Sequence, residues 1–174
     1  SFVSWAFYRF SDMDFAICGK TVTALKRNVV TPLTGILKAL GFSCSLKASQ
    51  NLLTIEKDGR RNRFYLFGGK DESSAALIQG ITLAGLFLDE VALMPQSFVE
   101  QALARCSVTG SKFWFNCNPE HPGHWFYREW IKSAKEKNAL YLHFTMEDNP
   151  SLPREIRKRY EALYRRPSYE RFLQ

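Results

Sequence analysis

The chain has 174 residues, a formal net charge of +7, 45% hydrophobic residues and 24% charged residues. These proportions are ordinary for a globular domain with one sizeable core and argue against a disordered chain. No apolar run approaches the ~20 residues of a membrane span, and no signal peptide is visible, so we expect neither a membrane protein nor a secreted one. The four cysteines have no paired spacing and are expected to be reduced thiols.

The first part of the chain predicts a helix, a short strand, a second helix and then a two-stranded hairpin. Val3, Ala6 and Phe7 fall on one face at helical spacing. Pro32 is expected to kink or split the second helix, because the residue before a proline avoids the α region. Asp58-Gly59 between two strand-like runs predicts a tight hairpin. The predicted elements are a helix over 1–10, a strand over 14–18, a helix over 21–40, and strands over 51–56 and 62–68.

Residues 84–92, AGLFLDEVA, contain the strongest candidate for a functional site. Residues 85–88 form a continuous apolar run, which is typical of a buried parallel strand. Asp89 and Glu90 follow it directly, at the end of the strand where open α/β sheets bind ligands. In P-loop NTPases this is the Walker B element: the first carboxylate supports a Mg²⁺ shell, and the second polarises the attacking water. The alternative is a strand that ends in a solvated acidic turn.

A second apolar run, 112–117, ends in polar residues about 25 positions later. Residues 95–105 between the two runs have helical spacing, with Phe98, Val99 and Ala102 on one face. Strand–helix–strand at this length predicts a βαβ unit with parallel strands. Asn116 or Asn118 could then face Glu90 across a nucleotide γ-phosphate and act as a sensor. The alternative is that Asn118-Pro119 forms an ordinary turn.

Three stretches resemble the large terminase subunit of tailed phages, in particular the PBSX-like group. They are LFLDEVALMPQSFVEQALARCSVTGSKFWFNCNPEHPGHWFYREWI, HFTMEDNPSLPREIRKRYEALY and FAICGKTVTALKRNVV. The resemblance implies a P-loop ATPase domain, a linker and a nuclease domain, with ATP and Mg²⁺ as cofactors. It also implies packaging of double-stranded DNA into a procapsid in the cytoplasm of the bacterial host. The implied partners are the small terminase subunit, the portal protein and further copies of the same chain in a ring.

The phosphate-binding loop of such ATPases is missing from the sequence. The pattern G-x-x-x-x-G-K-[ST] would need a glycine at position 14 before Gly19-Lys20-Thr21, and that position is Asp14. The resemblance instead places the loop upstream of Ser1, so we expect a single partial ATPase domain over 1–174, without the nuclease domain. The isolated chain is then expected to hydrolyse ATP negligibly. A degenerate phosphate loop at Lys20-Thr21 is the alternative.

Two basic clusters are candidates for contact with DNA phosphates, which are recognised without regard to sequence. One is Arg60, Arg61 and Arg63 in the hairpin, and the other is Arg157, Lys158 and Arg159 near the end of the chain, where Ile156, Tyr160 and Leu163 would form a packed stripe. A solvated basic face, or a contact with an acidic neighbour, is the alternative for the second cluster.

The resemblance also implies an arginine that stabilises charge on the transferring phosphoryl group. Several related terminases have a basic residue before a glycine ahead of the Walker B strand, but here the match is Gln79-Gly80. Glutamine cannot supply that charge. Arg27 and Arg105 are possible substitutes, and both can equally be ordinary surface residues of helices.

The last third of the chain predicts a strand over 139–145, a helix that begins near His124, and a final helix after Ser151. Cys117, His121 and His124 could in principle bind zinc, but no fourth ligand is apparent and no zinc is expected.

We therefore predict a RecA-like, mostly parallel sheet flanked by helices, with an antiparallel edge hairpin. Its strands are expected near 14–18, 64–68, 85–89, 112–117 and 139–145. Two other functions stay open: a different P-loop ATPase that acts on nucleic acid, such as a helicase-like or repair enzyme, and a non-catalytic module that binds DNA or a partner.

Overall fold

The computed structural model of the chain describes residues 1–118 and 121–164. The chain divides into two compact units, Ser1–Asn118 and Pro119–Gln174. The first unit is built on a six-stranded sheet in the order β2-β3-β4-β1-β5-β6. No helix in the described residues is long and apolar enough to cross a membrane.

The centre of the sheet is parallel and one edge is antiparallel. β1 (Asp14–Gly19) pairs in parallel with β4 (Arg60–Gly68) and with β5 (Gly85–Leu88), and β5 pairs in parallel with β6 (Lys112–Phe115). β2 (Ser43–Lys47) and β3 (Leu52–Lys57) extend the sheet beyond β4 as antiparallel strands. The predicted mixed sheet with an antiparallel edge is confirmed. β2 was not predicted, because it is a short, largely exposed edge strand rich in polar residues.

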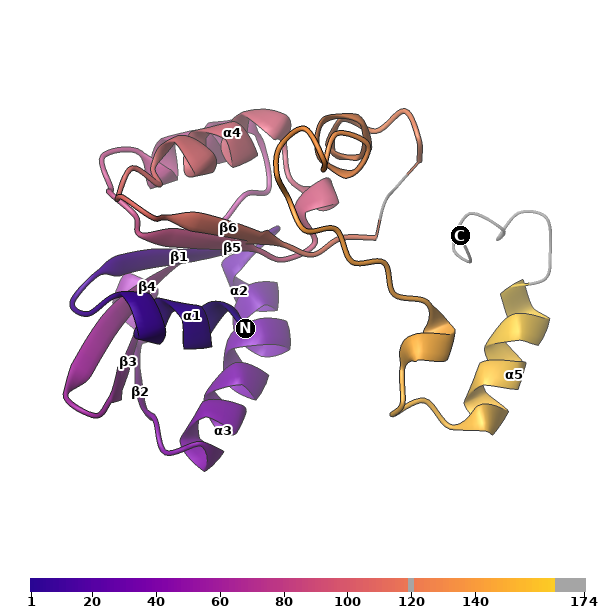
Figure 1. Ribbon diagram of the computed structural model, residues 1–174, viewed down its shortest axis with the longest axis horizontal. Helices are drawn as coiled ribbons and strands as arrows, with labels where there is room; N and C mark the ends of the chain where they lie inside the picture. The colour runs from indigo at the N-terminus through magenta and orange to yellow at the C-terminus, as the bar shows by residue number, and fades with distance from the viewer. Residues whose placement is uncertain (119–120, 165–174) are drawn as a thin grey trace. The chain divides into compact units, whose positions relative to one another are not determined.

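Helices cover both faces of this sheet (Figure 1). α1 (Phe2–Arg9), α2 (Val22–Leu25) and α3 (Thr31–Ala39) lie on one face, and α4 (Gln96–Ala104) lies on the other. Strand side chains alternate between faces, so Phe15 and Ile17 of β1 pack in the cluster with α1 and α3. Six aromatic residues dominate that cluster: Phe2, Trp5, Phe15, Phe64, Phe87 and Trp114.

The helix predicted over 21–40 forms without a break at Pro32. The helix widens instead into a π-helical segment, Lys26–Val30, and Pro32 lies in the first turn of α3. Proline has no backbone N–H, and its ring crowds the preceding turn. The wider turn accommodates this, because the backbone N–H of Thr31 and its hydroxyl both donate to the Lys26 carbonyl.

The hairpin prediction is confirmed. Asp58 and Gly59 both have positive φ, 51° and 75°, which is the backbone of a two-residue type I′ turn. β3 and β4 each extend up to this turn.

The second unit contains helical turns and α5 (Arg154–Tyr164). The chain is α-helical over residues 125–126 and then π-helical over Tyr127–Ile131. The prediction of a strand over 139–145 is wrong: within the described residues this segment has no regular structure, and Leu140 and Phe144 are 85% and 73% exposed. An isolated extended segment cannot form ladder hydrogen bonds without a neighbouring strand.

Candidate functional site

The site begins where β5 ends. Asp89 continues the ladder, since its backbone N–H donates to the Cys18 carbonyl of β1 at 2.8 Å. Glu90 then adopts a left-handed conformation, with φ 51° and ψ 50°, and the chain turns into the short 3₁₀ helix Val91–Leu93. Asp89 is half-buried and Glu90 is exposed. The turn therefore places two consecutive carboxylates at the carboxyl edge of the sheet.

Asn116, the first residue after β6, contacts both acidic residues. Its side-chain Nδ2 donates to Asp89 Oδ1 at 2.8 Å, and its Oδ1 accepts the Glu90 backbone N–H at 2.6 Å. Its backbone N–H donates to the Leu88 carbonyl at 3.1 Å, and its carbonyl accepts the Val91 N–H at 3.0 Å. One asparagine thus makes four hydrogen bonds to the segment that carries the carboxylates.

The chain leaves the neighbouring strands β1 and β5 toward opposite faces of the sheet. α2 follows β1 on one face and α4 follows β5 on the other (Figure 1). Ligands of open α/β sheets bind outside the carboxyl ends of strands at such a switch point. The predicted location of Asp89 and Glu90 at this edge is confirmed by the strand pairing.

Gly19-Lys20-Thr21 does not form a phosphate-cradling loop. Gly19 is the last residue of the central strand β1, and Thr21 caps α2 by accepting the Ala24 N–H at 3.2 Å. Lys20 is exposed at the carboxyl edge, and Lys70 follows the end of β4 at the same edge, where Gly69 N–H donates to the Gly19 carbonyl. Lys20 was predicted only as part of the alternative phosphate loop at Lys20-Thr21, and Lys70 was not predicted. Each follows the end of a parallel strand by one or two residues, which was the available signal.

Asn118 lies two residues beyond Asn116 and is exposed. Both asparagines follow β6, so both lie past the carboxyl end of the strand next to β5. The role of sensor for Asn118 stays a prediction.

The described residues hold no group of three or more His, Cys, Asp and Glu side chains that could bind a metal ion by themselves. A lone carboxylate such as Asp89 does fit Mg²⁺ that is coordinated mainly by phosphate oxygens and water, because protein sites for this ion commonly supply only one or two carboxylates. The Asp89 carboxylate, which would supply an oxygen ligand to the ion, is also held in place by the side chain of Asn116.

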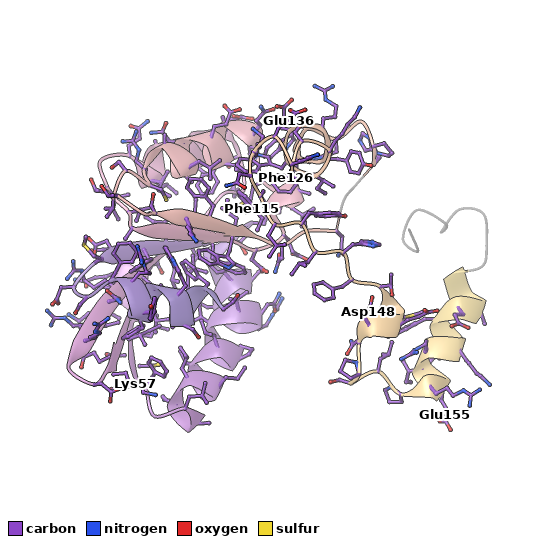
Figure 2. All side chains as sticks on the ribbon, viewed as in Figure 1. Lys57, Phe115, Phe126, Glu136, Asp148 and Glu155 are labelled. Atoms are coloured by element: carbon purple, nitrogen blue, oxygen red, sulfur yellow. The ribbon has the colours of Figure 1, made fainter. Side chains whose placement is uncertain are left out.

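The three hairpin arginines make intramolecular contacts at the opposite, amino edge of the parallel strands. Arg60 Nη1 donates to the Phe7 carbonyl at 2.7 Å near the end of α1, Arg61 pairs with Asp12 at 3.1 Å, and Arg63 pairs with Asp14 at 2.5 Å. A surface hollow of about 510 Å³ lies beside them, lined by Lys57, Arg60 and Arg61 among others. In Figure 2, Lys57 lies at this hairpin end, far from Phe115 at the end of β6.

The two arginine-finger candidates lie in different places. Arg105 ends α4, and its carbonyl accepts the Leu83 N–H ahead of β5, so it lies at the amino edge. The four-residue strand β5, which spans about 13 Å, lies between that point and Asp89. Arg105 therefore lies at the opposite end of β5 from the carboxylates of its own copy. Arg27 is exposed in the π-helical segment Lys26–Val30, and its Nε donates to Asn28 Oδ1 at 3.0 Å.

The second basic cluster lies on α5. Lys158 and Arg159 are exposed, as predicted. Arg157 is half-buried, so the prediction that it faces outward is wrong. Tyr160 and Leu163 of the predicted packed stripe are 38% and 53% exposed. The described rest of this unit holds only short helical turns, so it offers α5 no sheet or long helix against which a whole apolar stripe could be buried.

The mixed sheet, its two helical layers and the position of the acidic pair define an α/β protein with the fold of large terminase ATPase domains. The ATPase domain of the large terminase of Thermus phage P74-26 superposes with a TM-score of 0.54, covering 72% of this chain and 55% of that chain. Its sequence identity is 17%, so this likeness concerns the fold alone.

The family model for the terminase large subunit, T4likevirus-type, N-terminal, matches residues 37–174, and the chain belongs to this family. The large terminase of a thermophilic bacteriophage is similar over 99% of this chain, with 55% identity and a TM-score of 0.93. A structure of that protein with ADP has 52% identity and a TM-score of 0.93, and one with ATP-gamma-S has 51% and 0.90. This chain spans 42% of the length of the first two of these chains and 41% of the third. Comparison with curated proteins finds no match.

Proposed function

We propose that this chain is part of the ATPase motor of a phage terminase large subunit, which couples ATP hydrolysis to the packaging of double-stranded DNA into a procapsid. The observation that carries the proposal is the Asp89–Glu90 pair at the carboxyl edge of the sheet, held by Asn116. The chain that forms this sheet is 55% identical, over nearly its whole length, to the large terminase of the thermophilic bacteriophage. The nucleotide complexes of that protein support ATP as the ligand.

Each residue of the site has a separate task in this proposal. Asp89 holds, through water, the Mg²⁺ that neutralises charge on the nucleotide phosphates. Glu90 is exposed and accepts a hydrogen bond from the attacking water, which orients that water toward the γ-phosphate. Asn118 donates its amide N–H to the γ-phosphate and so distinguishes ATP from ADP. Gly19-Lys20-Thr21 does not cradle the other phosphates in this proposal, because Gly19 is part of a strand.

The partners follow from the same proposal. A packaging motor works as a ring of identical chains on double-stranded DNA, with the portal and the small terminase subunit, in the cytoplasm of the bacterial host. The isolated 174-residue chain would hydrolyse ATP negligibly, because one carboxylate pair without phosphate-binding backbone supplies little nucleotide affinity.

The proposal is tested by ATP hydrolysis of the full-length protein, with and without double-stranded DNA. We expect turnover that rises with DNA and falls on the order of 1,000-fold in Glu90→Gln, which loses the charge that polarises water. Glu100→Gln, on the exposed surface of α4, is the matched control and should keep wild-type turnover. Absence of both turnover and nucleotide binding in the wild-type protein would refute the ATPase, and DNA binding would become the activity to pursue.

A further inference from the structure

We propose that Asn116 is the positioning residue of this site: its side chain holds the Asp89 carboxylate and the backbone of Glu90 in the arrangement that hydrolysis requires. This inference rests on the proposed ATPase function and narrows it. The sequence alone suggested contact of Asn116 with the nucleotide, whereas the structure commits its amide to the two acidic residues.

Glu90 needs such support because of its backbone. A left-handed conformation brings Cβ close to the following carbonyl oxygen in any residue other than glycine. It persists where surrounding contacts over-determine it. The Glu90 N–H to Asn116 Oδ1 bond at 2.6 Å, together with the two backbone bonds that Asn116 makes to Leu88 and Val91, fixes the turn from both sides.

The left-handed turn also matters for the geometry of the acid pair. Consecutive side chains of a continuing strand point to opposite faces of the sheet. The turn at Glu90 ends that alternation directly after Asp89, so that both carboxylates can serve one ligand at the edge.

The chemistry of the amide suits this task on both sides. Its oxygen accepts from the Glu90 N–H, and its NH₂ group donates to the Asp89 carboxylate. If the amide were flipped, its NH₂ group would face the Glu90 N–H and its oxygen would face the carboxylate, so both hydrogen bonds would be lost. A carboxylate at position 116 would keep the contact with Glu90 but would repel Asp89. Asn116 is itself exposed, so its replacement should leave the core of the unit intact.

These features define a kinetic test in the full-length protein, with Asn116→Ala and Asn116→Asp beside wild type. Misplacement of a reacting group by about 1 Å can cost on the order of 100-fold in rate. We expect kcat to fall by about that factor, with KM for ATP within about threefold of wild type. Asn116→Asp should be the slower variant although it is the closer isostere. A residue that only fills space would give the reverse order.

Hydrogen exchange of the peptide covering 85–93 provides a readout that does not depend on catalysis. Both variants should exchange faster than wild type there. Adding Asp89→Asn to Asn116→Asp restores a donor opposite an acceptor and should slow exchange again. Gln50→Ala, which removes an exposed amide elsewhere, is the control and should leave this peptide unchanged.

The outcomes separate the two proposals. If wild type hydrolyses ATP but both Asn116 variants retain its kcat and its exchange, the positioning role is wrong and the ATPase stands. If wild type has neither turnover nor nucleotide binding, the ATPase itself is refuted, and unchanged exchange in both variants would still refute the positioning role.

Discussion

Arg63 and Asp14 face each other across β4 and β1, and Arg63 Nε donates to Asp14 Oδ1 at 2.5 Å. The two residues are register partners at the first position of the central parallel ladder. The hydrogen bond to Asp14 raises the pKa of Arg63 above its ordinary value, so this guanidinium stays charged. An arginine that was a candidate for DNA contact therefore joins the two central strands.

Arg63→Ala should lower the free energy of unfolding by about 1 kcal/mol, as expected for a half-buried, well-aligned ion pair. Urea titration of the purified protein measures this. Arg61→Ala is a matched control: its pair with Asp12 is more than half exposed and should contribute less. Equal losses in the two variants would contradict a special role for Arg63.

Contact with DNA is expected instead from the exposed basic residues of α5. Removing both Lys158 and Arg159 should weaken binding equally for all duplex sequences and reduce the slope of log affinity against log salt by about 1.8. Binding measured by fluorescence anisotropy at several salt concentrations gives this slope. If the slope is unchanged in the double variant but reduced in Arg63→Ala, the hairpin and not α5 contacts DNA.

Asn62 is fully buried and ties the loop before β1 to β4. Its Oδ1 accepts the Met13 N–H, and its Nδ2 donates to the Phe10 carbonyl, both at 3.1 Å. Asn62→Ala leaves both backbone groups without their partner and should cost about 2 kcal/mol of stability. Thermal unfolding measures the loss, with Gln50→Ala as an exposed amide control. A shift no larger than that of the control would show that water replaces both bonds.

Glu90→Gly should raise stability while abolishing turnover. Glycine adopts φ near +50° without the steric penalty of a Cβ atom. Its greater conformational freedom in the unfolded chain offsets part of that gain, so we expect a net stabilisation of about 0.5–1 kcal/mol. Glu100→Gly in α4 is the reference and should destabilise by a similar amount, because that residue is helical. Thermal unfolding of both variants compares them. A decrease for Glu90→Gly would mean that its side chain, and not its backbone, determines the local stability.

Stability should also fall in alkali through Cys18. Burial raises the pKa of this thiol far above its usual range, and it raises the pKa of Cys106 to about 12. A thiol whose pKa is higher in the folded state than in the unfolded state contributes its whole stabilisation below the pKa of the unfolded state, which is near 9. This stabilisation is lost progressively as the pH rises above 9 toward the pKa of the folded state. Each pH unit above 9 should cost about 1.4 kcal/mol through Cys18. Urea titrations between about pH 8 and 11 measure the slope, which should be shallower in Cys18→Ala.

The elements with strong local signals were predicted closely. β5 has the bounds that its apolar run indicated, and α4 buries Phe98, Val99 and Ala102 as their spacing required. The Asp58-Gly59 turn was equally clear, because few residue pairs adopt positive φ twice in succession. The segment 139–145 has a similar apolar content and forms no strand in the described part of the chain, since a strand depends on a partner that no local pattern specifies.

The sequence by itself determined that Asp89 and Glu90 lie at the carboxyl edge of a parallel strand, because the apolar run ends there and a βαβ unit aligns its neighbour. Only the tertiary structure decided what Asn116 touches and which arginines are already paired. The side-chain bonds of Asn116 and the ion pairs of Arg61 and Arg63 join residues 26 to 49 positions apart. They depend on strand register and side-chain direction, which are set when the sheet assembles and not by the preference of any single segment.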